Sequence, residues 1–161
     1  MKILKILNSG LKSAAALVTV LSMGIHASAA TCIVDNGIVY RLLNASEAQV
    51  YYTKVGGKPT VCENGTPPES YSGDIFIPST ITYNGATYKV TDLYTAFQRT
   101  DITSITISAG ISVGFNALEG CTKLTSVILP PDLKCLEPGA LDRCTALKSI
   151  TIPGSVTRIR Q

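Results

Sequence analysis

A repeat of 23 residues in the C-terminal half of the chain constrains its fold more than any other sequence feature. One unit starts at Leu124 and runs to Ala146, and the same pattern restarts at Leu147. The unit before it starts at Ile102 and is one residue shorter. A unit of this length cannot bury its apolar side alone, so neighbouring units stack and share a continuous core. We therefore expect a solenoid.

The same residue types recur at equivalent positions of consecutive units. Three columns are aliphatic, one is alanine and one is cysteine: Ile102, Leu124 and Leu147; Ile105, Val127 and Ile150; Ile107, Leu129 and Ile152; Ala117 and Ala140; Cys121 and Cys144. The aliphatic columns lie in a segment rich in β-branched residues, which favours a short strand. The rest of each unit mixes apolar spacings, which predicts a bend, a short extended piece and one helical turn. The predicted fold is mainly β with short helical or 3-10 turns, as a right-handed solenoid with a parallel sheet on one side.

A more divergent unit precedes these repeats. Residues 75–78 read as its strand and residues 90–97 as its return, with residues 82–88 as an inserted hairpin around Asn84-Gly85. Asn-Gly between alternating residues is the strongest short-range hairpin signal. The stack then has about three and a half turns over residues 70–161. Because Gln161 falls partway through a turn, we expect the array to continue in a longer protein; the alternative is a frayed last half-turn.

The repeat also resembles a known family. Its pattern, L-x-x-I-x-I-P-x-x-V with A-F-x-x-C later in the unit, is similar to the BspA-type (Treponema pallidum type) leucine-rich repeat of bacterial and protist surface proteins. Leu118 and Leu141 stand in place of the usual Phe, and Thr100 in place of the Cys. The resemblance covers residues 70–161. It implies a leucine-rich repeat fold and an adhesive role, in which the protein binds host extracellular proteins or other bacteria.

Residues 31–69 lack the repeat. Residues 37–43 and 48–55 read as two strands, followed by a turn at residues 56–59. We expect this segment to form a small N-terminal β cap, because solenoids need their apolar ends covered for solubility. Cys32 and Cys62 flank the unit and are predicted to form a disulfide.

The first 30 residues read as a secretory signal peptide. Lys2, Lys5 and Lys12 precede an apolar run at residues 14–25 and a small-residue stretch at residues 27–30. We therefore expect a secreted or cell-surface protein. Three of the fourteen Lys and Arg lie in this segment, so eleven remain against eleven Asp and Glu, and the mature chain is formally neutral. A neutral chain has no electrostatic footprint for nucleic acid, and we expect no membrane insertion of the mature chain.

Few residues are available for catalysis. The only histidine, His26, lies in the signal segment. Its removal excludes Ser-His-Asp and Cys-His catalysis and zinc sites that use His. No two cysteines have the C-x-x-C spacing, and Glu119 and Asp142 share one phase away from the sheet. We expect neither an enzyme nor a bound metal or cofactor.

The outward positions of the predicted strands are the candidate partner-binding residues. They form a ladder of mostly small polar side chains: Thr103, Ser104, Thr106, Thr125, Ser126, Ile128, Lys148, Ser149 and Thr151. Such a flat face suits an extended partner protein, although a plain solvated scaffold would carry the same residue types. Cys135 is expected to point outward. It is a candidate for an intermolecular disulfide, or it results from random sequence drift in one repeat.

These patterns favour a secreted or cell-surface module for protein–protein interaction or adhesion, without catalytic activity. Its partner would be an extracellular or surface protein, such as a host matrix protein or a protein of another bacterium. Two alternatives stay open: a non-catalytic accessory segment of a larger exported enzyme or glycan-handling system, and a purely structural envelope protein.

Overall fold

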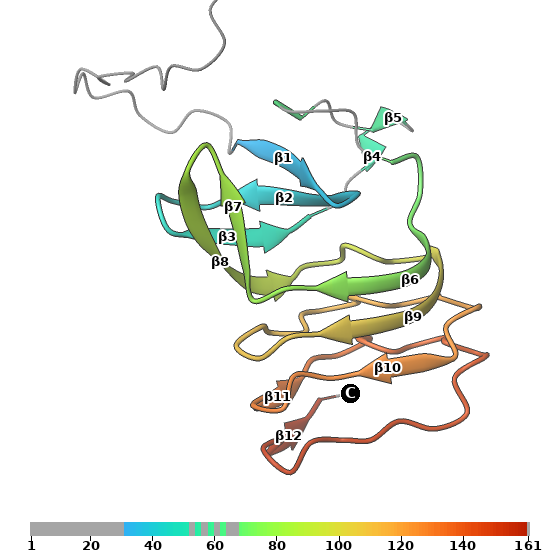
Figure 1. Ribbon diagram of the computed structural model, residues 1–161. Coiled ribbons are helices and arrows are strands. Elements are labelled where there is room, and N and C mark those ends of the chain that lie inside the picture. The colour runs from blue at the N-terminus through green and yellow to red at the C-terminus, as the bar shows by residue number, and fades with distance from the viewer. Residues whose placement is uncertain (1–30, 52–53, 56–57, 60–61, 64–67, 161) are drawn as a thin grey trace, which may run out of the picture.

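The computed structural model describes residues 31–160 except 52–53, 56–57, 60–61 and 64–67 (Figure 1). The signal peptide predicted over residues 1–30 lies outside the described residues. The described chain is mainly β and contains no helix. It accordingly has no helix able to cross a lipid bilayer in the part that the structure describes.

A five-stranded sheet forms the N-terminal part of the molecule. Its order is β1-β2-β3-β8-β7, and its strands are β1 (Cys32–Asp35), β2 (Ile38–Leu42), β3 (Glu47–Val50), β7 (Thr80–Tyr83) and β8 (Ala86–Leu93). All neighbours pair antiparallel except β3 and β8, which are parallel. A separate two-stranded pair joins β4 (Lys54–Val55) to β5 (Lys58–Pro59).

Two tight turns connect hairpins of this sheet. At Asn84-Gly85 the φ angles are +49° and +78°, so the predicted hairpin is confirmed as β7 and β8. Asn36-Gly37, with φ angles of +47° and +76°, connects β1 to β2 in the same way. Both residues of such turns need positive φ, which Asn and Gly tolerate best, and the resulting twist matches that of the strands.

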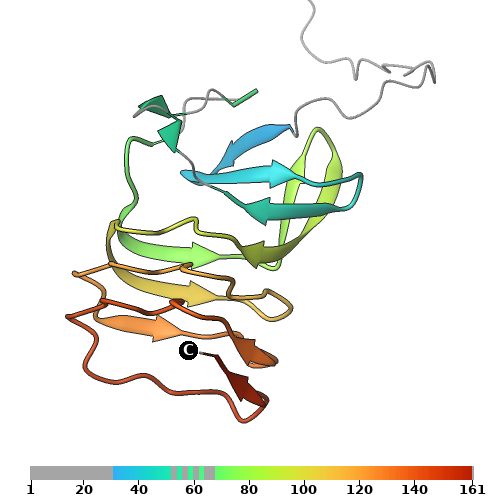
Figure 2. The same ribbon diagram turned by 180° about the vertical axis from the view of Figure 1, so that it is seen from behind.

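The repeats build a second, parallel sheet of order β10-β9-β6 (Figures 1 and 2). Its strands are β6 (Ser72–Ile77), β9 (Asp101–Ile107) and β10 (Ser126–Ile128). Ile75, Ile105 and Val127 lie in register across it. Later in the same unit as β10, β11 (Cys135–Leu136) pairs parallel with β12 (Arg158–Ile159) of the next unit. The alignment of repeats read from the sequence is thus the register of the strands.

Among the described residues, the return segments consist of successive hydrogen-bonded turns, and neither an α-helix nor a 3-10 helix forms there. The reason lies in their backbone bonding. The Leu118 and Gly120 amides donate to carbonyls of the next turn, at 3.0 and 2.8 Å, whereas the intervening Glu119 amide donates within its own turn, to Asn116 at 3.2 Å. Because alternate N–H groups bond to the neighbouring turn, the consecutive local bonds that a helix requires cannot form.

Left-handed residues recur at two stacked positions of the return segments. Thr95, Asn116 and Gly139 form one column, and Arg99, Gly120 and Arg143 form the other, all with φ between +35° and +72°. Most L-residues adopt this conformation at a cost of about 1–2 kcal/mol, so Thr95, Arg99 and Arg143 are strained, whereas Asn and Gly tolerate it. The hydrogen bonds between turns recur at the same positions in each turn, and they hold these residues in the left-handed conformation.

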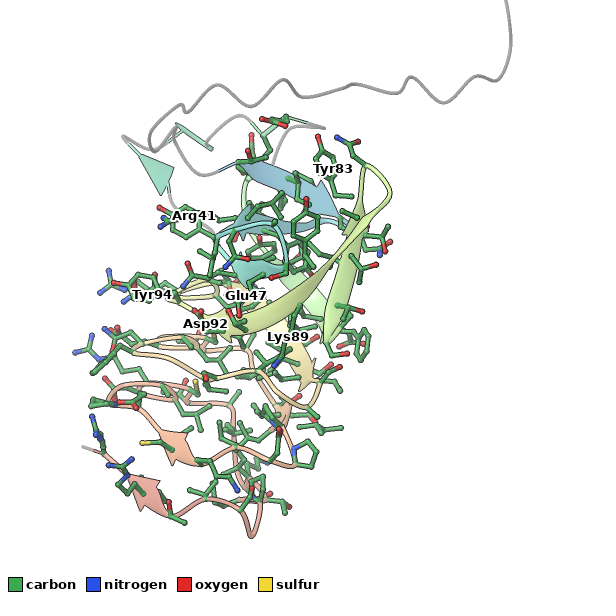
Figure 3. The ribbon with its side chains drawn as sticks, turned by 90° about the vertical axis from the view of Figure 1, so that its left-hand side faces the viewer. Arg41, Glu47, Tyr83, Lys89, Asp92 and Tyr94 are labelled. Atoms are coloured by element: carbon green, nitrogen blue, oxygen red, sulfur yellow. A yellow bond between two sulfur atoms is a disulfide. The ribbon has the colours of Figure 1, made fainter. Side chains whose placement is uncertain are left out.

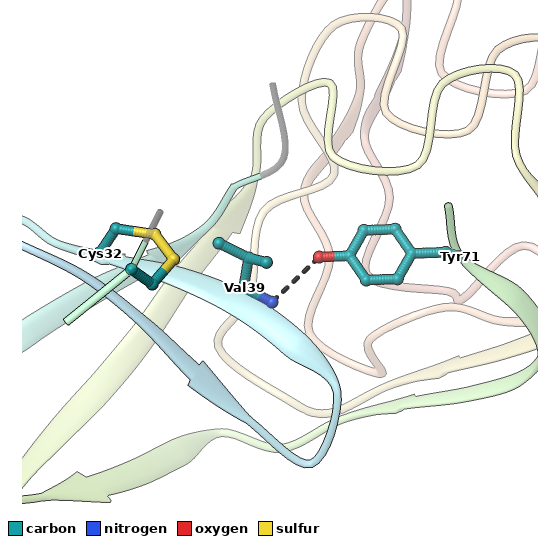
Figure 4. Close-up of a disulfide and its surroundings, with 4 residues drawn as sticks. Cys32, Val39 and Tyr71 are labelled. Atoms are coloured by element: carbon teal, nitrogen blue, oxygen red, sulfur yellow. Dashed lines mark hydrogen bonds between the residues drawn. A yellow bond between two sulfur atoms is a disulfide. The ribbon is translucent and has the colours of Figure 1, made fainter. Parts of the chain in front are cut away.

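One apolar core runs through both sheets. Buried residues from β1, β2, β3 and β8 belong to the same cluster as those of the repeats. Tyr71 connects the two parts: its hydroxyl accepts a hydrogen bond from the Val39 amide at 2.9 Å (Figure 4), and its ring lies 4.8 Å from that of Phe97. Since β7 and β8 lie beyond residue 70 in the chain, the five-stranded sheet combines residues from both sides of the predicted boundary.

The cysteines fall into two classes. Cys32 and Cys62 are joined by a disulfide (Figure 4). Cys121 and Cys144 are buried free thiols, and each donates to a carbonyl of the preceding turn, Phe97 at 3.0 Å and Leu118 at 3.2 Å. Their equal roles explain why cysteine recurs at this position.

Candidate partner-binding surface

The outward face of the parallel sheet carries most of the residues singled out in the sequence. On β9, Ile102, Ile105 and Ile107 are buried in the core, and a register shift against β6 leaves two outward residues between the first two of them. The register brings Ser104 beside Ser126. Lys148, Ser149 and Thr151 lie in a segment without regular structure. The nine candidates are all exposed or half-buried: Thr103, Ser104, Thr106, Thr125, Ser126, Ile128, Lys148, Ser149 and Thr151.

Asp74 is a functional candidate that the sequence reasoning missed. It lies on β6 in register with Ser104, and its Oδ1 accepts hydrogen bonds from Ser104 Oγ at 2.7 Å and Thr103 Oγ1 at 2.9 Å. The hydrogen bond from Ser104, followed by that from Thr103, lowers the pKa of the Asp74 carboxyl. The carboxylate is therefore fixed and charged at neutral pH. Extending the repeat alignment upstream would have placed Asp74 on the outward ladder.

Two large apolar side chains also stand on this face. Phe76 and Ile128 are 61% and 57% exposed, and both lie in register with Thr106, one on each side of it. Only the aliphatic one of the pair was among the predicted residues. Exposed apolar groups framed by polar ones are typical of surfaces that bind protein.

A hollow of about 350 Å³ opens beside Phe76, between the β1–β2 turn and β6. Figure 1 shows this turn above β6. The residues that line it are Asn36, Ile38, Tyr40, Asp74, Ile75, Phe76 and Pro78. Its walls are thus mostly apolar, with polar groups from Asn36 and Asp74. The sequence could not indicate this hollow, because its two sides come from different sheets.

The opposite side of the molecule carries polar pairs and two exposed aromatic side chains. Tyr94 and Phe115 are each about half exposed. Gln49 donates a hydrogen bond to Asp92, and the Arg41 guanidinium lies 5.0 Å from the centre of the Tyr51 ring. Figure 3 shows Arg41 and Tyr94 projecting from one side of the molecule, with Glu47, Lys89 and Asp92 on the adjoining side.

Carboxylates on this opposite face are held by their neighbours. Glu119 accepts a hydrogen bond from Gln98 and lies 3.9 Å from Arg99, and Asp142 lies 3.5 Å from Arg143. Within the described residues, no group of His, Cys, Asp and Glu is arranged to hold a metal ion.

Cys135 is half-buried and lies in register with Arg158. It lines a second hollow, of about 250 Å³, together with Asp132, Lys134 and Glu137. Burial first, then the hydrogen bond and charge of Glu137, raise the pKa of the Cys135 thiol. A raised pKa lowers the thiolate fraction and hence the reactivity at neutral pH.

Comparisons with known proteins agree with the repeat geometry. A family model described as a BspA type leucine rich repeat region (6 copies) matches residues 93–161. A leucine-rich repeat protein from Bacteroides capillosus ATCC 29799 is similar in structure, with a TM-score of 0.65 and 27% identity over 81% of this chain and 88% of that one. No curated protein matches the sequence.

Two longer proteins share the fold. A leucine-rich repeat protein from Bacteroides ovatus ATCC 8483 has a TM-score of 0.63 and 26% identity, over 79% of this chain and 31% of that one. A leucine rich cell surface protein from Faecalibacterium prausnitzii A2-165 has a TM-score of 0.58 and 24% identity, over 82% of this chain and 33% of that one. The chain therefore spans about a third of each of these two neighbours.

Proposed function

Because residues 93–161 belong to the BspA-type leucine-rich repeat family, we propose that the protein is a secreted or cell-surface module that binds a partner protein and catalyses no reaction. The partner is an extended segment of an extracellular or surface protein. It lies across the outward face of β6, β9 and β10, which is called the strand face below. The role of such a module is adhesion.

The exposed pair of Phe76 and Ile128 is the observation that carries this proposal. A solvated scaffold gains nothing from two large apolar side chains that stand more than half exposed on either side of Thr106. Around them, Ser104, Thr125 and Ser126 offer hydroxyl groups at the surface. An extended peptide could place apolar side chains on the pair and bond its backbone to the hydroxyls.

Export is supported by two observations. The Cys32–Cys62 disulfide suits an oxidising compartment outside the cytosol. The similar protein from F. prausnitzii is described as a cell surface protein. In this proposal the five-stranded sheet is the N-terminal cap of a right-handed stack, supported by the shared core and by the strong right-handed preference of crossovers between parallel strands.

Peptide selection with matched variants tests the proposal. Linear peptides selected for binding to the protein from a phage-displayed library are measured against Thr125→Tyr/Ser126→Tyr, which fills the strand face. Thr122→Tyr/Thr145→Tyr is the control, since both threonines are exposed in turns outside the strands. We expect the first variant to lose binding and the control to keep it, with thermal unfolding unchanged in both.

Two results would contradict the proposal. One is selection of peptides that bind the first variant as well as the unmodified protein, which would place the binding surface elsewhere. The other is the absence of any enriched peptide, which would favour a structural envelope protein. Hydrolysis of a polysaccharide or peptide by the purified chain would contradict the non-catalytic role.

A further inference from the structure

The geometry points to a cation subsite on the strand face: we propose that the hollow beside Phe76 receives a lysine or arginine side chain of the bound segment, whose charge pairs with Asp74. This inference rests on the proposed function and deepens it, because it names the chemistry that the partner must present. It assigns a role to Asp74 and Phe76 that repeat geometry alone does not require.

The walls of the hollow suit the stem of a long cationic side chain. Ile38 and Tyr40 at its base are almost completely buried, while Ile75 and Pro78 are half-buried and Phe76 is open to solvent. Lysine and arginine lay their methylene stems on apolar surface and keep the charged head at a polar rim. A hollow of about 350 Å³ has room for one such side chain.

The charge of the hollow is negative, and it has no counter-ion among the described residues. Neither lysine nor arginine is among the residues that line it, and Asp74 takes part in none of the ion pairs of the described residues. Both hydrogen bonds from Thr103 and Ser104 reach Oδ1. Oδ2 accepts no hydrogen bond within the described part of the chain, which leaves it for a donor on the partner.

The lining of the hollow carries a net negative charge. Asp74 is the one charged residue among the described residues that line it. A single carboxylate without a lysine or arginine beside it favours a cation over a neutral ligand.

Phe76 adds an aromatic face to this site. Its ring is 61% exposed, two residues from Asp74 on the same side of β6. An ammonium or guanidinium group over an aromatic face is stabilised by the ring quadrupole. The carboxylate and the ring therefore select for positive charge together, whereas a sugar would use the ring and hydroxyls without needing the charge.

Titration with a defined peptide tests the subsite. The 15N-labelled protein is titrated with the end-blocked pentapeptide Gly-Val-Arg-Val-Gly, and amide shifts are followed by NMR. The matched peptide carries citrulline, which keeps the shape of arginine but lacks the charge. We expect shifts centred on Asn36, Asp74 and Phe76, and affinity about fivefold weaker for the citrulline peptide, the scale of an exposed ion pair with a cation–π contact.

Two variants and a control locate the interaction. Asp74→Asn keeps an oxygen for Thr103 and Ser104 but removes the charge, and should weaken the arginine peptide about fivefold without affecting the citrulline peptide. Phe76→Leu keeps an apolar side chain but removes the ring, and should weaken it by a smaller factor. Asp142→Asn, an exposed aspartate of a return segment, should leave the affinity unchanged.

The outcomes separate this inference from the proposed function. Equal affinity for the two peptides, or full affinity in Asp74→Asn, would overturn the cation subsite. Tighter binding of the neutral oligosaccharide cellotetraose at the same amides would also overturn it. If library peptides still lose binding to Thr125→Tyr/Ser126→Tyr while Asp74→Asn has no effect, the strand face stands as the binding surface and only the cation subsite fails.

Discussion

The five-stranded sheet and the stacked repeats reach the same apolar core by different means. Local antiparallel hairpins with Asn-Gly turns build most of the sheet, and a disulfide between Cys32 and Cys62 closes it. The repeats pair in parallel through segments about 22 residues apart, and Cys121 and Cys144 stay reduced inside the core. The first region is stabilised by short loops and a covalent bond, the second by equivalent residues that meet across turns.

The difference appears in how burial is distributed. In the repeats, Ile102 and Leu124 are fully buried, but Leu147 at the equivalent position of the following turn is only half-buried. Ile105, Val127 and Ile150 follow the same trend. Equal sequence positions thus differ in the stability they contribute, because each turn depends on neighbours on both sides.

Truncation in the core should have the largest effect. Leu124→Ala is expected to lower the free energy of unfolding by about 2–5 kcal/mol through a buried cavity. Leu147→Ala should cost less, because its side chain is only partly buried. Urea denaturation of both variants measures the difference. Equal losses would show that the gradient of burial does not control stability.

Removal of the disulfide should come next. The double variant Cys32→Ala/Cys62→Ala opens a loop with a sequence separation of 30 residues. In the chain-entropy model this lowers stability by roughly 3–4 kcal/mol. Urea denaturation of this variant is compared with that of Cys121→Ala, which removes one buried thiol and leaves the disulfide intact. Mass spectrometry that finds Cys32 and Cys62 as free thiols in the unreduced protein would contradict the prediction.

Substitutions at the left-handed positions of the return segments should have a smaller effect on stability. Gly139→Ala should destabilise by about 1–2 kcal/mol, since φ is +69° and the added methyl group meets the Asn116 side chain. Arg143→Gly, at φ +57°, should change stability by less than about 1 kcal/mol, in the stabilising direction. Thermal unfolding of both variants shows whether Gly139→Ala lowers the melting temperature and Arg143→Gly raises it. A stable Gly139→Ala protein would mean that the return segment can rearrange.

The buried thiols should have an effect only at alkaline pH. Burial, followed by the nearby Cys121, raises the pKa of the Cys144 thiol from its ordinary value near 9 to about 11. A raised folded-state pKa means that the native state holds the proton more tightly, so its contribution is complete below pH 9 and is lost as the pH rises through 11. Urea midpoints across this window should fall more steeply in the unmodified protein than in Cys144→Ala. Identical slopes would contradict the prediction.

Much of the fold could be predicted from the sequence because it depends on which residues recur. The periodic columns of Ile102, Ile105 and Ile107 give the register of β9 against β10, and Asn84-Gly85 gives the β7–β8 hairpin. These features need only local turn chemistry and the requirement that apolar side chains face one core. The outward ladder follows from the same pattern, since residues between the core positions must face away.

What depends on contacts between turns or sheets could be decided only by the tertiary structure. The return segments are successive turns rather than helices because alternate amides bond to carbonyls in the next turn, as Leu118 does with Ala140. The β7–β8 hairpin joins β3 rather than the repeats because its apolar residues meet the N-terminal strands. The hollow beside Phe76 exists because the Asn36-Gly37 turn lies over β6. The sequence by itself determined the repeat and its inward face, and long-range bonding decided the rest, because a backbone group takes whichever partner the packed chain brings within reach.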